Sequence, residues 1–167
     1  RNGDVIRALV RLLVNGGGAC SEDSLVGLGA LCEDGVAQEA IGNEPGAISA
    51  IVAMLAQGPA LLVESASWLL ANLCQSDVNK ILFSEEAGGF DCLTRCLVEF
   101  ADNNVIRDNC TMIVALLSRD SDNQVLLTQH TNLLLAITSL IDKIDGTNAG
   151  AESRLNALVT MANISAG

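Results

Sequence analysis

The amino-acid sequence repeats itself about every 42 residues, and this period constrains the fold more than any other feature. Four segments carry apolar residues at the three- and four-residue spacing of a helix buried along one side. They are residues 4–13, 46–55, 88–97 and 132–141. Their first residues lie 42, 42 and 44 positions apart, so each predicts a helix at the same place in successive repeats.

These four segments are the second helices of the repeats, and a third helix is expected after each, at residues 22–32, 62–74, 105–118 and 152–165. In each, an apolar residue lies one position before the last residue, and a small residue lies three before it. The small residues are Gly29, Ala71, Ala115 and Ala162, which allow neighbouring helices to approach closely. Shorter helices are expected between the repeats, at residues 36–41, 77–83 and 122–130. Three helices in about 42 residues indicate an armadillo or HEAT class of repeat.

The predicted fold is therefore all-α, a right-handed α-solenoid in which each repeat stacks on the next. We expect one domain over residues 1–167, with an incomplete first repeat at 4–44 and further repeats at 45–86, 87–130 and 131–167. Apolar side chains at both ends are expected to lack a neighbouring repeat to cover them. They are Ile6, Leu9, Val10 and Leu13 at the first end and those of residues 155–164 at the last. We expect a piece of a longer array that can self-associate through these ends.

The second repeat resembles a known family. It contains Gly46-Ala-Ile-Ser-Ala-Ile-Val-Ala-Met-Leu55, followed by Glu64-Ser-Ala-Ser-Trp-Leu-Leu-Ala-Asn-Leu73. The Gly-Ala-Ile start of one helix and the Trp-x-x-x-Asn of the next are similar to an armadillo repeat. The resemblance covers essentially the whole chain and is strongest over residues 46–86.

The resemblance implies where a partner binds. In armadillo proteins the third helices line a concave groove, the Trp contacts side chains of a bound peptide, and the Asn four residues later bonds its backbone. Trp68 and Asn72 occupy these positions here. The Trp position of other repeats holds Val26 and Met112, and the Asn position of the last repeat holds Asn163.

Acidic residues stand one turn before the Trp position, at Glu22, Glu64 and Asp108, whereas Leu155 breaks the series. Residues four apart share one side of a helix, so Glu64, Trp68 and Asn72 should form one strip. One interpretation is an acidic and apolar groove for a basic, amphipathic segment. The other is that acids near the start of a helix favour its dipole.

Composition narrows the partner class. The formal net charge is −11, and the chain has only 9 Lys and Arg residues. Nucleic-acid binding depends on such residues, as does attraction to anionic lipid, so neither is expected and the natural partner is a basic protein or peptide. No apolar run is long enough to span a bilayer, and we expect a cytoplasmic or nuclear protein with six reduced cysteines.

Catalytic and metal-binding patterns are missing from the sequence. His130 is the single histidine, and no two cysteines form a CxxC pair, so neither a metal nor another cofactor is expected. Cys92 and Cys96 align with apolar positions of other repeats and are expected in the core. Cys110 lies near Asp108, whose carboxylate should raise the thiol pKa and make it a poor nucleophile.

The sequence thus favours a non-catalytic protein-interaction scaffold that binds a partner in the groove of the third helices. Two alternatives within this class stay open: a co-chaperone-like or regulatory module gripping a folded partner, and a peptide binder like a nuclear-import adaptor. A separate interpretation is a purely architectural segment of a longer solenoid. The competing class is an enzyme, which would require chemistry outside this chain.

Overall fold

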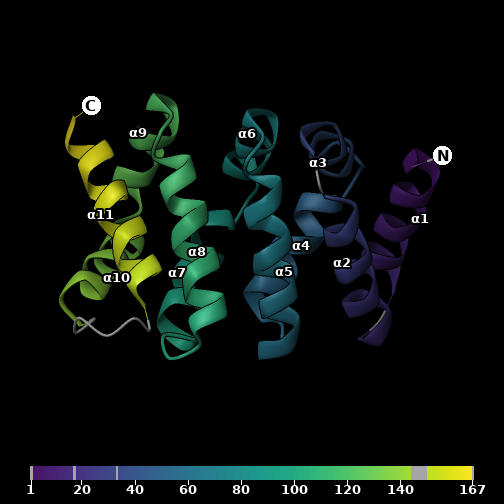
Figure 1. Ribbon diagram of the computed structural model, residues 1–167, viewed down its shortest axis with the longest axis horizontal. Helices are drawn as coiled ribbons and strands as arrows, with labels where there is room; N and C mark the ends of the chain where they lie inside the picture. Colours follow the sequence, from purple (N-terminus) through teal and green to yellow (C-terminus); the bar gives the residue numbers. More distant parts are fainter. Residues whose placement is uncertain (1, 17, 33, 144–149, 167) are drawn as a thin grey trace.

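The computed structural model describes residues 2–16, 18–32, 34–143 and 150–166, and within these ranges the secondary structure is helical, without strands (Figure 1). The helices are α1 Asn2–Asn15, α2 Ala19–Leu31, α3 Gly35–Gly42, α4 Ala47–Gln57, α5 Ala60–Leu73, α6 Asp77–Glu85, α7 Gly89–Glu99, α8 Asn104–Leu117, α9 Ser121–Gln129, α10 Thr131–Lys143 and α11 Ala151–Ala166. Every predicted helix is present, and its bounds differ from the predicted ones by at most a few residues.

The helices form two rows and an edge. The third helices of the repeats, α2, α5, α8 and α11, stand side by side at the front of Figure 1, and each packs on the next. Behind them α4 packs on α7 and α7 on α10, with α1 beside α4. The short helices α3, α6 and α9 lie along the upper edge. This is the predicted all-α solenoid of three-helix repeats.

Two glycines set the start of the second helix in successive repeats. Gly46 and Gly88 have φ of 82° and 80° and immediately precede α4 and α7. This left-handed conformation is one that residues with a Cβ rarely adopt. The Gly-Ala-Ile pattern therefore begins with a turn residue and not, as the sequence ranges implied, with the first residue of the helix.

One continuous apolar core runs through the repeats, from Ile6 in α1 to Ala157 in α11. The expectation that Ile6, Val10 and Leu13 lie uncovered at the first end was wrong, because α1 packs on α2, α3 and α4 and these side chains are at most 3% exposed. Other apolar side chains remain open at the two ends. They are Val5, Leu12 and Val14 of α1 and Leu155 and Leu158 of α11.

The cysteines belong mainly to this core. All six are free thiols; Cys20 is exposed and the other five are buried. Cys92 and Cys96 were predicted in the core, and their exposures of 2% and 0% confirm this.

Candidate functional site

The exposed side of the third helices, here called the third-helix face, presents the strip predicted on α5. Trp68 is 43% exposed, while Glu64 and Asn72, four residues before and after it, are half-buried. The amide nitrogen Nδ2 of Asn72 donates a hydrogen bond of 3.1 Å to the carbonyl oxygen of Trp68. The predictions that Trp68 is partly open to solvent and that Asn72 lies beside it are confirmed.

The indole of Trp68 is held against the neighbouring repeat. A Cβ placed on Gly29 of α2 would lie 1.9 Å from Cζ3 and 2.6 Å from Cη2 of Trp68. The ring therefore occupies the space that any other residue at position 29 would fill. This contact fixes one side of the indole on α2 and leaves the rest of it open, which is the arrangement of a rigid aromatic contact residue.

Glu64 is oriented by the start of α8. Its Oε1 accepts a hydrogen bond of 2.6 Å from Nδ2 of Asn103, whose own Oδ1 caps α8 by accepting from the amide of Ile106 at 3.2 Å. A charged acceptor makes this one of the stronger hydrogen bonds of the face. Glu64 thus joins α5 to α8 and keeps its carboxylate at the surface.

Glu22 and Val26 extend the strip onto α2. Val26 is 54% exposed, and the carboxylate of Glu22 is exposed without a hydrogen bond or ion pair to any residue that the structure describes. Neither α2 nor α5 contains Lys or Arg, whereas they carry Glu22, Asp23 and Glu64. The α2–α5 part of the third-helix face is therefore acidic and apolar.

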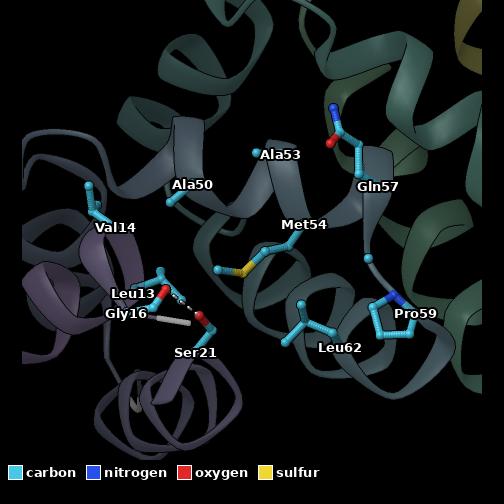
Figure 2. Close-up of a pocket in the computed structure, with 11 residues that line it drawn as sticks. Leu13, Val14, Gly16, Ser21, Ala50, Ala53, Met54, Gln57, Pro59 and Leu62 are labelled. Atoms are coloured by element: carbon cyan, nitrogen blue, oxygen red, sulfur yellow. Dashed lines mark hydrogen bonds between the residues drawn. The ribbon is translucent and has the colours of Figure 1, made fainter. Parts of the chain in front are cut away.

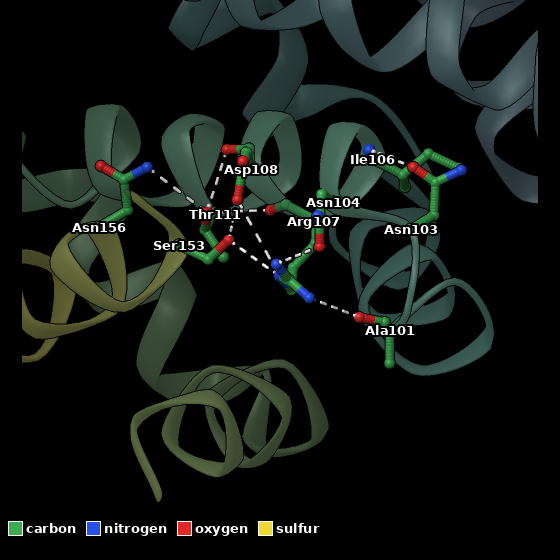
Figure 3. Close-up of polar contacts among 9 residues, drawn as sticks. All are labelled: Ala101, Asn103, Asn104, Ile106, Arg107, Asp108, Thr111, Ser153 and Asn156. Carbon is green, nitrogen blue, oxygen red and sulfur yellow. Dashed lines mark hydrogen bonds and ion pairs between the residues drawn. The ribbon is translucent and has the colours of Figure 1, made fainter. Parts of the chain in front are cut away.

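Asp108, predicted on the acidic strip, is engaged by a residue of α11. The hydroxyl of Ser153 on α11 donates to Oδ1 of Asp108, and Nε of Arg107 lies 4.0 Å from the same oxygen (Figure 3). Arg107 is itself nearly buried, with hydrogen bonds of 3.0 Å to Ser153, 2.9 Å to the carbonyl of Ala101 and 2.7 Å to Asn104. Such a buried cation requires this set of acceptors. The carboxylate of Asp108 completes the α8–α11 packing.

The predicted influence of Asp108 on Cys110 is wrong. A hydrogen bond to Cys96 and burial raise the pKa of Cys110 well above the usual value for a thiol, with smaller contributions from the charges of Cys96 and Cys92, and none from Asp108. The pKa of Cys110 is raised, as predicted, but for a different reason, since the carboxylate of Asp108 points to α11.

The two remaining predicted residues lie toward the last repeats. Met112 is half-buried and packs on the core. Nδ2 of Asn163 donates to Oγ of Ser118, at 3.0 Å, and thereby ties α11 to the end of α8. A bond that sequence reasoning missed acts in the same way between α8 and α5, where Nδ2 of Asn109 donates to Oγ of Ser67 at 3.2 Å.

Metal-binding clusters are not found in the part of the chain that the structure describes. There, no three His, Cys, Asp or Glu residues gather as metal ligands. His130 stacks on Phe90, with ring centroids 4.5 Å apart. Of the described helices, none has both the length and the apolar character needed to cross a membrane.

Comparison with known proteins identifies the architecture. No protein-family model and no curated protein matches the chain. Among solved structures, it superposes on computationally designed armadillo repeat proteins for modular peptide recognition, with a TM-score of 0.82, 21% identity, and coverage of 98% of this chain and 66% of theirs.

A designed armadillo repeat protein in complex with the peptide (KR)4 gives a TM-score of 0.79 at 18% identity, covering 96% of this chain and 64% of that one. An engineered protein gives 0.81 at 18% identity, covering 98% and 63%. The chain thus spans less than two thirds of the length of the first structures that it matches. At such identities the likeness concerns the fold, and it agrees with the repeat period, the three-helix order and the Trp-x-x-x-Asn of α5: the chain has an armadillo-type repeat fold.

Proposed function

We propose that this chain is a non-catalytic scaffold that binds a basic, amphipathic segment of a partner protein on the α2–α5 part of the third-helix face. The observation that carries the proposal is Trp68, which is 43% exposed yet fixed by its contact with Gly29. Burying an exposed aromatic ring of fixed position costs little conformational entropy, so such residues are typical binding contacts.

Charge supports a basic partner. Glu22, Asp23 and Glu64 flank the apolar surface of Val26 and Trp68, and α2 and α5 supply no cation to neutralise them. A Lys or Arg side chain can lay its aliphatic stem on the indole while its charge meets a carboxylate. Related folds also support a peptide ligand, because one of the matched designs was solved with the peptide (KR)4.

A folded partner is the second candidate, and the Asn positions favour it. Position 72 holds Asn, but the equivalent residues of the first and third repeats are Ala30 and Leu116. Asn163 already donates to Ser118. The amide of Asn72 donates to the carbonyl of Trp68 in its own helix. The face therefore lacks a row of free amides that would hold an extended backbone, and a partner that binds mainly through its side chains fits it as well.

The test uses the intrinsic fluorescence of Trp68, which is the single Trp of a chain without Tyr. We expect the peptide (KR)4 to change this emission saturably, and a peptide of alternating Glu and Ser to leave it unchanged. Calorimetry should show weaker (KR)4 binding for Trp68→Ala and for Glu22→Gln, and affinity should fall with added salt.

Glu85→Gln is the matched control, since Glu85 is an exposed acid on α6, away from the third-helix face. It removes the same charge as Glu22→Gln and should retain wild-type affinity. Equal losses in both variants would show only attraction to the net charge of −11 and would overturn the proposed site.

A further inference from the structure

A cleft of about 420 Å³ opens between the C-terminal end of α1 and the turn from α4 to α5 (Figure 2). Its walls are mainly apolar and include Leu13, Met54 and Leu62, from α1, α4 and α5. The carbonyl of Gly16 lies at one side, where it accepts from the hydroxyl of Ser21 at 3.4 Å. The cleft shares no residue with the proposed site around Trp68.

The next repeat junction shows what fills the same space there. Leu13 and Gly16 correspond, 42 residues later, to Leu55 and Gly58, and Ala53 corresponds to Arg95. Nη1 of Arg95 donates to the carbonyl of Leu55 at 2.7 Å, and Nη2 lies 3.5 Å from the carbonyl oxygen of Gly58.

Two further side chains support Arg95 at that junction. Its guanidinium carbon lies 5.2 Å from the ring centroid of Phe100, and its Nε donates to Glu99 at 2.8 Å. The chain thus places one arginine, stacked on an aromatic ring, below the end of α4. A planar guanidinium suits this place because it presents several donors to neighbouring carbonyls and carries a charge that favours a helix C-terminus.

At the first junction these side chains are absent. Ala53 stands in place of Arg95, and Gly58 in place of Phe100. A Cβ at Gly58 would lie 2.5 Å from the carbonyl oxygen of Met54, so the local backbone leaves no room for a side chain there. The cleft is therefore the space that an arginine and an aromatic ring occupy one repeat later.

We propose that this cleft is a docking site for an arginine side chain of a partner polypeptide. The arginine stem would lie on Leu13 and Met54, and its guanidinium would face the carbonyl end of α1, as Arg95 faces that of α4. The residues that line the cleft are uncharged. Charge complementarity favours this occupant because the cleft ends at the negative pole of α1 and belongs to a chain of net charge −11. The proposal does not depend on the function proposed for the third-helix face.

The probe is the peptide acetyl-Ala-Arg-Ala-amide, compared with the same peptide carrying citrulline, which keeps the shape of arginine without its charge. In ¹⁵N-labelled protein we expect the arginine peptide to shift the amide signals of Gly16, Ala53 and Gly58 saturably. Citrulline should bind at least about tenfold more weakly, because hydrogen bonds from charged donors are the stronger ones. Equal binding of the two peptides would overturn the proposal, as would shifts confined to the indole signal of Trp68.

A variant of the chain itself can place an arginine side chain in the cleft. Ala53→Arg recreates the residue found at position 95, so its side chain should fill the cleft, raise the urea midpoint of unfolding and abolish the response to the arginine peptide. Ala53→Gln is the matched control, since it adds a long neutral side chain and should leave the response largely intact. Undiminished binding of the peptide to folded Ala53→Arg would contradict the assignment. If that variant fails to fold, the comparison of arginine with citrulline on the wild-type chain still decides it.

Discussion

The contact between Gly29 and Trp68 can be broken with a single methyl group. In Gly29→Ala the new Cβ would lie 1.9 Å from Cζ3 of the indole, whereas ordinary carbon contacts are about 3.5–4.0 Å. The ring must move by well over an ångström. Since Trp68 is already 43% exposed, the indole can move away from α2 into solvent.

Two opposing effects set the magnitude. Forcing extra volume into a packed contact costs about 1–3 kcal/mol. Alanine stabilises a helix interior relative to glycine by about 1 kcal/mol. We therefore expect Gly29→Ala to destabilise the protein by roughly 0–2 kcal/mol, with a larger change in the environment of Trp68 than in the stability.

Gly27→Ala is the matched control on the same helix. Its Cβ would lie 3.2 Å from Cδ1 of Leu9, the end of a half-buried side chain that can adjust. It gains the same helix propensity without touching the indole. We expect urea unfolding to show that Gly27→Ala is more stable than Gly29→Ala. Fluorescence should show red-shifted emission and stronger acrylamide quenching in Gly29→Ala alone. Unchanged emission in Gly29→Ala, with stability raised as in the control, would refute the packing described for Trp68.

Three more outcomes are expected. In Gly42→Ala the Cβ would lie 1.9 Å from Oδ1 of Asn79, whose amide donates to the carbonyls of Gln38 and Leu73, so urea unfolding should show a loss of about 2–3 kcal/mol. Burial raises the pKa of Cys74 to about 12, and the folded state therefore holds this proton more tightly than the unfolded one; stability should fall as pH rises above 9, and less steeply in Cys74→Ala. The exposed Leu12 and Leu158 at opposite ends should make sedimentation depend on concentration, and substitution of both by Glu should abolish this dependence.

The helices and the core could be predicted because the same apolar pattern occurs in four repeats. A single segment such as residues 89–99 gives an ambiguous apolar pattern, but four copies in register fix which side of each helix is buried. Burial of Cys92 and Cys96 followed from the same alignment. The exposure of Trp68 followed from its position in the armadillo pattern.

The polar contacts of the site could not be predicted, because they depend on the helix that lies opposite. Glu64 and Asp108 occupy the same repeat position, yet Glu64 accepts from a capping residue of α8 while Asp108 accepts from Ser153 of α11. Asn72 and Asn163 are likewise equivalent, but Asn72 bonds its own helix and Asn163 bonds Ser118. A repeat alignment equates positions within a helix and says nothing of the partners that differ between junctions.

The differences between equivalent positions nevertheless carry information about binding. Where a repeat keeps the scaffold but has a small residue in place of a large one, a space remains open, as at Ala53, the position equivalent to Arg95. Where a repeat has a large side chain packed against a small residue of the neighbouring helix, that side chain is partly exposed, as Trp68 is over Gly29. Both changes fall at the junction of the first two repeats, and the acids of α2 and α5 flank it. Both proposed binding sites of this chain therefore lie between α1 and α5.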